Sequence, residues 1–382
     1  MNSSHSRQHA LSDQHAGTLV AADVGGTHAR IALIDAGLKG KTSFSIRQYR
    51  KYACAEYPSL AAIIDEFRSS VVQAPVASVA LAIAGYVVDD AVVNVNLAWP
   101  VSISGLRTAL GIREIAIVND FEAVAHAVGY VEAGDTVRLS GPDVAQEGPV
   151  LVVGPGTGLG AALRIPQQDR AIILATEAGQ ATLAPNTDFE IDLLRELRKH
   201  RPRVLIEHVL SGTGLINLDA AVRALRGAPA QSFTPAQITA AALAQSDPLA
   251  IETVDVFCGW FGSVLGDMAL LYGARGGIYL AGGVLPQMKD LLVRSRFVDR
   301  FLDKGAMREA LARTAVHLID HAQLGVIGAA SWYFDRDLNT PRAEHANARA
   351  GNGVATTMDP HEPASGAQRT RPQTTTRGGE RS

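Results

Sequence analysis

The sequence predicts an α/β fold built from two domains. Apolar segments typical of buried strands alternate with segments that repeat apolar residues at helical spacing. Three of the apolar strands end in a glycine turn, at Gly25-Gly26, at Gly154–Gly158 and at Gly282-Gly283. A chain of 382 residues is also longer than one simple core requires, and the glycine turns recur about 130 residues apart.

The first half of the chain supplies the expected strands in order. Residues 18–24 (TLVAADV) and 28–35 (HARIALID) predict two buried strands, and the glycine pair between them favours a tight hairpin. Residues 78–85 (SVALAIAG) and 114–120 (EIAIVND) have the same strand character. The residues that follow switch to helical spacing, so Asp120 is expected where a strand ends and a helix begins.

The second half repeats the pattern with more helix. Residues 149–154 (PVLVVG) and 276–284 (GGIYLAGGV) are expected strands that each lead into a glycine turn. Residues 252–274 predict a long apolar helix in the centre of a core. Two further helices are expected to begin at capping boxes, which are Thr187 with Glu190 and Thr234 with Gln237, the latter with Pro235 at the first helical position.

Both ends of the chain are expected to lie outside the folded body. Residues 1–17 are polar and predict a disordered extension. Residues 335–382 predict a disordered tail, because beyond Pro341 the only large apolar residues are Val354 and Met358. The folded body is therefore expected over residues 18–334.

Composition excludes several classes of protein. A net charge of −3 without long like-charge blocks gives no case for nucleic acid or a membrane surface as a partner. The two cysteines, Cys54 and Cys258, are too few for a cysteine-rich zinc cluster and favour a reducing compartment. The uncharged run at 148–163 is too short and too rich in Gly and Pro to span a membrane, and the N-terminus lacks the apolar block of a signal peptide. We expect a cytoplasmic protein.

The glycine turns favour phosphate chemistry. Glycine lets consecutive backbone N–H groups approach an anion, and a threonine hydroxyl adds a donor. The turns Gly25–Thr27 and Gly156–Gly158 could thus face the phosphates of one nucleotide from two sides. Asp23, beside the first turn, suits a Mg²⁺ ion held through water. Any single turn of this kind could equally be plain structure; the three together favour a nucleotide site.

The commoner phosphate motifs are absent from the sequence. Gly40-Lys41-Thr42 resembles the end of a P-loop, but Asp35 stands where the first glycine of that motif belongs. The segment GPGTGLG places glycine at every second position, which is not the spacing of a dinucleotide fingerprint. A different nucleotide-binding family is therefore indicated.

Five segments together resemble the bacterial glucokinase family, in the order that the family has them. They are AADVGGTHARIALID, AIVNDFEAVAHAV, VVGPGTGLGAAL, EHVLSGTGLINL and IYLAGGVLP, and the resemblance covers about residues 18–334. That family belongs to the actin-like, hexokinase-like ATPases, so the resemblance implies two ribonuclease-H-like domains that flank a cleft and close on sugar and MgATP. It implies a small domain at 18–130 joined by a C-terminal helix at 320–334, and a large domain at 131–319.

The resemblance also assigns roles to site residues. Asp120 would take the proton from the sugar 6-hydroxyl, although local sequence alone is also compatible with a simple helix N-cap. Asn96, Asn119, Glu177, Gln180 and Glu207 would bind the sugar. The expected nucleotide site comprises Ala22, Asp23, Val24, Gly25, Gly26, Thr27, Gly156, Thr157, Gly158, Gly282 and Gly283, with Mg²⁺ at Asp23.

The chain departs from the family at one loop above all. Thr176-Glu177-Ala178-Gly179-Gln180 stands where the family has Gly-Glu-Gly-Gly-His. Gln180 can donate and accept hydrogen bonds but does not titrate, and two lost glycines stiffen the loop, more so if those positions need positive φ. His28 replaces a usual Asn and Tyr86 a usual Pro.

The expected activity is ATP-dependent phosphorylation of glucose to glucose 6-phosphate. The altered loop leaves open a kinase for another hexose or hexosamine. A sugar- and ATP-binding regulator with low turnover is a further alternative, disfavoured by the retained Asp120. An actin-like filament protein would have no need of the paired glutamates Glu177 and Glu207. Whether the chain forms a homodimer stays open.

Overall fold

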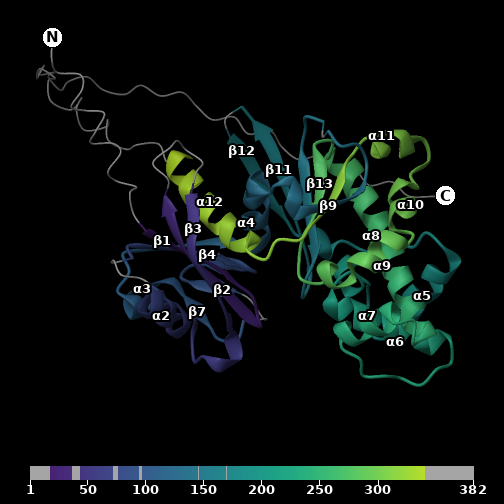
Figure 1. The fold of residues 1–382 in the computed structure, drawn as a ribbon. Helices are drawn as coiled ribbons and strands as arrows, with labels where there is room; N and C mark the ends of the chain where they lie inside the picture. The colour runs from purple at the N-terminus through teal and green to yellow at the C-terminus, as the bar shows by residue number, and fades with distance from the viewer. Residues whose placement is uncertain are drawn as a thin grey trace, which may run out of the picture. The chain divides into compact units, whose positions relative to one another are not determined.

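The computed structural model describes residues 18–36, 44–71, 76–93, 97–144, 146–168 and 170–339 (Figure 1). Residues 1–17, nearly all of the expected tail and Asn96 lie outside this part of the chain. The last helix, α12 (Leu324–Asn339), continues past the expected boundary at Asp335. It does so because Arg336 pairs with Glu114 and lies over the ring of Tyr333, which fixes another turn of the helix.

The first sheet has five strands in the order β3-β2-β1-β4-β8. Its strands are β1 (Thr18–Val24), β2 (His28–Ala36), β3 (Phe44–Ala53), β4 (Ser78–Ile83) and β8 (Glu114–Asn119). The first three are antiparallel, which confirms the expected hairpin, and β1, β4 and β8 run parallel. The carboxyl ends of β1 and β8, which carry Asp23 and Asn119, therefore face the same edge of the sheet.

The second sheet repeats this topology. It has the order β12-β11-β10-β13-β14-β9, with an antiparallel set β10–β12, parallel β13 and β14, and one added antiparallel strand, β9. Its strands are β9 (Thr136–Ser140), β10 (Val150–Pro155), β11 (Leu159–Gln167), β12 (Arg170–Thr176), β13 (Gly277–Leu280) and β14 (Val316–Ile319). The repeated topology explains why glycine turns follow corresponding strands, β1 and β10.

Helices cover both sheets. They are α2 (Leu60–Val71), α3 (Ile103–Leu110), α4 (Asp120–Ala127), α5 (Asp188–Arg198), α6 (Gly212–Leu225), α7 (Pro235–Leu243), α8 (Pro248–Tyr272), α9 (Lys289–Arg294), α10 (Phe297–Leu302) and α11 (Arg308–Ala312), besides α12. A small sheet that the sequence did not predict consists of β5 (Tyr86–Val88), β6 (Ala91–Val93) and β7 (Val101–Ser102). Its strands are two or three residues long, too short for a periodic signal.

The caps agree with the sequence at one helix and differ at another. The box at the start of α7 is complete, with Thr234 and Gln237 bonding to each other's backbone. At α5 the Thr187 hydroxyl accepts from the Glu190 N–H, but the Glu190 side chain does not return to Thr187. The predicted box is wrong in that half, because Glu190 is buried, forms an ion pair with Arg300 at 2.8 Å and accepts from the Asn186 N–H.

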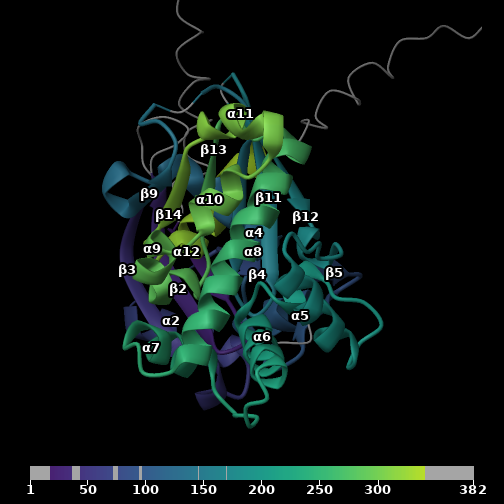
Figure 2. The same cartoon turned by 90° about the vertical axis from the view of Figure 1, so that its right-hand side faces the viewer.

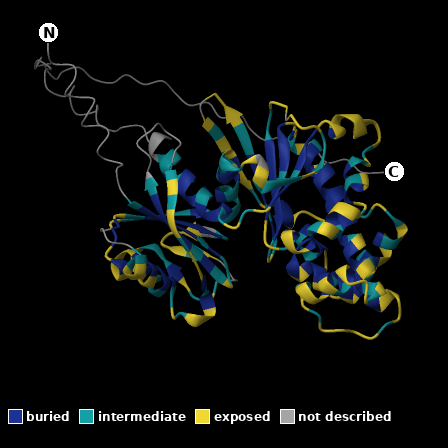
Figure 3. Cartoon of the chain, in the orientation of Figure 1, coloured by how far each residue is buried: buried dark blue, intermediate teal, exposed yellow. Residues whose placement is uncertain are grey.

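The largest core lies in the second half of the chain around α8, which contacts α6, α7 and α10 (Figure 2). Trp260, Phe257 and Phe261 are fully buried there. The central strands of both sheets, such as β1, β4 and β10, are also largely buried, whereas most residues of the edge strands β3 and β12 are exposed or half-buried (Figure 3). By length and composition α8 could cross a membrane, but 72% of its most apolar window is buried inside the protein, as in a core helix. The segment that best imitates a membrane helix is thus α8, whereas 148–163 largely forms β10 and β11.

The first sheet has a core on each face. One face packs against α2 and α3. The other packs against α12, through Val326, Ala329, Ala330 and Tyr333. The C-terminal helix therefore returns to the N-terminal sheet, as expected.

Candidate active site

Asp120 lies where β8 ends and α4 begins, as expected. The N-cap of α4 is Asn119, whose side-chain oxygen accepts from the N–H groups of Phe121 at 3.0 Å and Glu122 at 3.1 Å. Asp120 is therefore not the N-cap, although its Oδ1 also accepts from the Phe121 N–H, at 2.9 Å. The Asn119 Nδ2 donates weakly to the Gly85 carbonyl, at 3.4 Å. Capping engages the oxygen of Asn119 and leaves the amide nitrogen as the group that can serve a ligand.

The surroundings of Asp120 raise its pKa to about 6. Burial is the main cause, and the negative charges of Asp23 and Glu177 add to it, while the bond from the Phe121 N–H opposes it. Two other predicted site residues are thus close enough to act on this carboxylate. A carboxylate that titrates near neutrality can accept a proton at pH 7 better than an ordinary one.

The first glycine turn holds Asp23 in a confined place. Asp23 faces Arg30 across the β1–β2 pair, with 3.2 Å between the carboxylate and the guanidinium. Burial raises the pKa of Asp23 in spite of this partner. A Cβ on Gly325, in α12, would lie 2.6 Å from the Asp23 Cγ, so α12 closes one side. The Gly25 N–H donates to the His28 carbonyl at 3.0 Å and so closes the turn itself.

The second glycine turn joins β10 to β11 and contacts α6. The Gly156 N–H donates to the Gly158 carbonyl at 2.8 Å, and the Gly156 carbonyl accepts from the Gly212 N–H at 2.8 Å. A Cβ on Gly156 would meet nothing within 4 Å, so this face of the turn is open. In both turns the N–H of the first glycine is therefore already used within the protein, so the N–H groups left for a phosphate belong to the later residues, while the open face of Gly156 leaves room for a phosphate to approach.

Glu207 lies against the second turn. It belongs to a short 3-10 helix (Ile206–His208), and a Cβ on Gly158 would lie 2.6 Å from its Oε2. Gln180 Nε2 donates to its other oxygen, Oε1, at 2.8 Å. Ser211, which the sequence reasoning did not single out, donates to the Glu207 backbone carbonyl at 2.7 Å. Gln180 and Gly158 thus fix the position of this carboxylate.

The altered loop takes its shape without positive φ at its two changed glycine positions. Glu177 follows β12 and is exposed, and Ala178–Gln180 form a single 3-10 turn. Thr176 donates to the Ala161 carbonyl at 3.0 Å, which ties the loop to β11. Neither Thr176 nor Ala178 is among the described residues with positive φ. The two glycines that the family has at these positions are therefore not needed for the backbone here.

The third glycine turn meets the second. Gly282 has φ +97°, and a Cβ there would lie 2.7 Å from the Pro155 carbonyl oxygen. Gly283, in contrast, has open space where a Cβ would be. The structure thus brings Gly156–Gly158 and Gly282-Gly283 together, while Asn96 stays a prediction outside the described residues.

The residues fit a cation held through water rather than a cage of ligands. Among the described residues, no group of three or more His, Cys, Asp and Glu side chains could hold a metal ion. Asp23 offers one confined carboxylate whose charge is not fully balanced by Arg30, since its pKa is raised. Mg²⁺ keeps most of its water and takes few carboxylates, which suits such a site.

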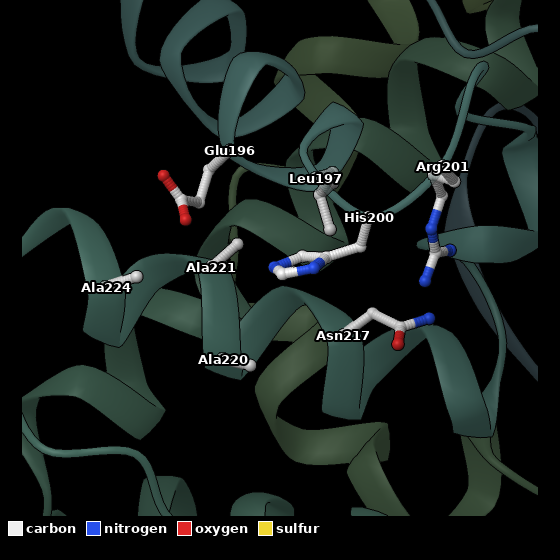
Figure 4. Close-up of a pocket in the computed structure, with 8 residues that line it drawn as sticks. All are labelled: Glu196, Leu197, His200, Arg201, Asn217, Ala220, Ala221 and Ala224. Atoms are coloured by element: carbon white, nitrogen blue, oxygen red, sulfur yellow. The ribbon is translucent and has the colours of Figure 1, made fainter.

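A separate cavity of about 220 Å³ lies between α5 and α6 (Figure 4). It is lined by Glu196, Leu197, His200, Arg201, Asn217, Ala220, Ala221 and Ala224. None of these is a predicted site residue. One lining residue is connected to the candidate active site: Asn217 Nδ2 donates to the carbonyl of His208 at 3.0 Å, and His208 follows Glu207 in the chain.

Comparisons with known proteins agree on one group. The Glucokinase family pattern matches residues 20–336. A glucokinase-like protein of Xylella fastidiosa (strain 9a5c) is 46% identical over 320 residues, which cover 84% of this chain and 95% of that protein. The glucokinase of Nitrobacter hamburgensis (strain DSM 10229 / NCIMB 13809 / X14) is 39% identical, with 82% and 96% covered.

The fold agrees as well. The crystal structure of a glucokinase from an Antarctic psychrotroph has a TM-score of 0.73 at 35% identity, and the match covers 83% of this chain and 99% of that one. The predicted two-domain, actin-like α/β fold is thereby confirmed.

Proposed function

This chain belongs to the glucokinase family of sugar kinases, and we propose that it transfers the γ-phosphoryl group of ATP to the 6-hydroxyl of glucose. We also propose that it works in the cytoplasm. The proposed division into domains is 18–130 with 320–334, and 131–319, and the packing of α12 on the first sheet supports it.

The observation that carries the proposal is the state of Asp120. A general base for a sugar hydroxyl must be ionised and held in place, and its pKa should lie near the pH at which the enzyme works. Asp120 has a fixed position at the start of α4 and a pKa raised to about 6. At pH 7 it is mostly ionised and would take the hydroxyl proton as the oxygen attacks phosphorus.

The nucleotide would be held by the glycine turns. Phosphoryl transfer depends on positioning and on compensation of the phosphate charge rather than on covalent chemistry by the protein. We assign the phosphates to the open faces of Gly156 and Gly283 and to the Gly25–Thr27 turn. Asp23 would hold Mg²⁺ through water, and the bound ion would neutralise charge on the phosphates.

The sugar would lie between Asp120 and the two glutamates. Carboxylates bind hydroxyl groups through strong, charge-assisted hydrogen bonds. Glu177 is exposed, and its negative charge helps to raise the pKa of Asp120. The Glu207 carboxylate is held by a hydrogen bond from Gln180. Asn119 would donate from Nδ2, since its oxygen caps α4.

A second candidate, a kinase for another hexose or a hexosamine, is favoured by one contact. The Gln180 amide is committed to Glu207 at 2.8 Å, so only its oxygen and second N–H can meet a sugar. An imidazole at this position would present a different set of groups. The hydroxyl pattern that the loop prefers can therefore differ from that of glucose.

The test is ADP release from purified protein against glucose, mannose, glucosamine and an N-acylated hexosamine. We expect glucose-dependent turnover that falls about 10²- to 10⁴-fold in Asp120→Asn. Glu122→Gln is the matched control, because Glu122 is also a carboxyl of α4 whose burial raises its pKa. Turnover with another sugar alone would favour the second candidate. Glucose binding without ADP release from the unmodified protein would contradict both in favour of a regulator.

A further inference from the structure

We propose that Phe121 is a positioning residue that fixes Asp120 relative to the second glycine turn. Its ring lies on a glycine seat formed by Gly154 and Gly160. The inference rests on the proposed function, in which Asp120 is the base. It assigns a role to Gly160, and in part to Gly154, which the phosphate hypothesis does not explain.

The glycine seat is a pair of residues opposite each other in adjacent strands. Gly154 in β10 and Gly160 in β11 are partners in the register of the antiparallel pair. A Cβ on Gly160 would overlap the Phe121 ring at Cγ, Cδ2 and Cε2. A Cβ on Gly154 would lie 2.9 Å from the Phe121 Cζ. The two glycines leave room for the ring against the strands, although a Cβ on Gly154 would first meet the Ala281 carbonyl.

Phosphate binding does not account for these two glycines. Both lie inside paired strands, on either side of the turn, and not at its tip. Gly156, at the tip, has open space where a Cβ would be, as expected of a residue that faces a ligand. Of the alternating glycines of GPGTGLG, Gly156 is therefore open, Gly158 lies against Glu207, and Gly154 and Gly160 receive the ring.

The backbone of Phe121 connects its ring to Asp120, the proposed catalytic base. Its N–H donates to Asp120 Oδ1 at 2.9 Å and to the cap oxygen of Asn119 at 3.0 Å. A shift of the ring on its seat must therefore move the first turn of α4 and the carboxylate with it. The same N–H lowers the pKa of Asp120, so a lengthened bond would raise that pKa.

The helix α4 links the two sheets, which makes the seat consequential. It follows β8 of the first sheet but packs its Ala125 and Ala127 against Val152 and Ala162 of the second. On its other side, the Ala123 carbonyl lies against Gly328 of α12. The Phe121 ring is the contact at the end of α4 nearest the phosphate turn. It thereby sets the separation between the proposed base and the proposed phosphate site.

The decisive experiment compares Phe121→Leu with Phe261→Leu. Phe261 is a fully buried ring of the large core, so the control makes the same truncation away from the site. Misplacement of a catalytic group by about 1 Å can cost about 10²-fold in rate. We expect Phe121→Leu to lower kcat at least about tenfold, with KM for glucose and ATP within about threefold, and to move the acid limb of kcat to higher pH. Phe261→Leu should lower Tm with kcat per folded molecule and the pH profile unchanged.

A second variant reaches the same contact from the other side. Gly160→Ala places a methyl group where the ring lies, so it should reproduce the kcat loss and the shift of the acid limb. Combined with Phe121→Leu, its effect should be much smaller than the product of the two single effects, because both break one contact. Multiplicative effects in the double variant would overturn the inference.

The outcomes separate this inference from the proposed function. If Asp120→Asn is inactive while Phe121→Leu keeps the parent kcat and pH profile, Asp120 is the base and the seat has no positioning role. If Asp120→Asn keeps full turnover, the assignment of the base is wrong and the inference fails with it.

Discussion

The two glycine turns that follow β1 and β10 look alike in sequence but have different surroundings. At the first turn a Cβ on Gly25 would meet only the His28 carbonyl, at an ordinary 3.7 Å. At the second, side chains of the protein itself occupy the space beside Gly158 and Gly160. A glycine-rich turn indicates that something approaches the backbone closely, but not whether that is a ligand or another part of the chain.

The difference follows from what lies next to each turn. The first turn is the end of a hairpin, closed by its own hydrogen bond between Gly25 and His28. The second is packed against α4, α6 and the Glu207 loop, all from distant parts of the sequence. We expect substitutions at the first turn to act on ligand binding, and those at the base of the second to act on stability and on the geometry of the site.

The largest effect on stability is expected at Asp120, at the start of α4. Its folded-state pKa is raised from 3.8 to about 6, so the folded protein holds this proton more tightly than the unfolded chain. The resulting stabilisation is full below about pH 4 and is lost as the pH rises through about 6. Above pH 7 the ionised carboxylate lowers the free energy of unfolding by up to about 3 kcal/mol relative to a neutral isostere.

Asp120→Asn should therefore be more stable than the parent at pH 8 and equal to it at pH 4. Urea unfolding at the two pH values measures the difference. If the variant loses turnover but gains no stability at pH 8, the surroundings of Asp120 stabilise its ionised carboxylate better than the raised pKa indicates.

The next largest effect is the difference in the free energy of unfolding between Gly160→Ala and Gly25→Ala. Overpacking at a filled contact costs about 1–3 kcal/mol, which we expect for Gly160→Ala because the methyl group meets the Phe121 ring. Gly25→Ala should change the free energy of unfolding by less than about 1 kcal/mol, since its Cβ has room and Gly25 is not among the positive-φ glycines. It should instead raise KM for ATP. Thermal unfolding and ADP-release kinetics measure the two, and equal destabilisation would refute the contrast between the turns.

Much of this architecture could be predicted from the sequence, because it depends on neighbours along the chain. The hairpin of β1 and β2, the helix start at Asp120 and the capping box at Thr234 all follow from local patterns. The long apolar segment became the core helix α8. The site residues that family motifs assign came with the same segments.

The contacts that give these residues their positions could not be predicted in this way. Glu190 fits a capping box by spacing but pairs with Arg300, 110 positions away. Gln180 was expected to meet the sugar, and its bond to Glu207 spans 27 positions. Phe121 follows the predicted base and gave no signal of its own. In each case the partner is set by how sheets and helices pack, which single-sequence periodicity does not contain.

The smallest effect is expected at Gln180, where the chain departs from its family. Gln180→Leu removes the donor to Glu207 Oε1, and loss of one such hydrogen bond is worth about 1 kcal/mol, or about fivefold in KM for glucose. Gln180→His keeps a donor but adds a titrating group. Its imidazolium should bind the Glu207 carboxylate more firmly, so KM for glucose should change more between about pH 6 and 8 than it does in the parent. Steady-state kinetics across that range checks both variants. If Gln180→Leu has the same KM as the parent, Gly158 and the Ser211 hydrogen bond are enough to hold Glu207. The second glycine turn, rather than the altered loop, would then fix the carboxylate that binds the sugar.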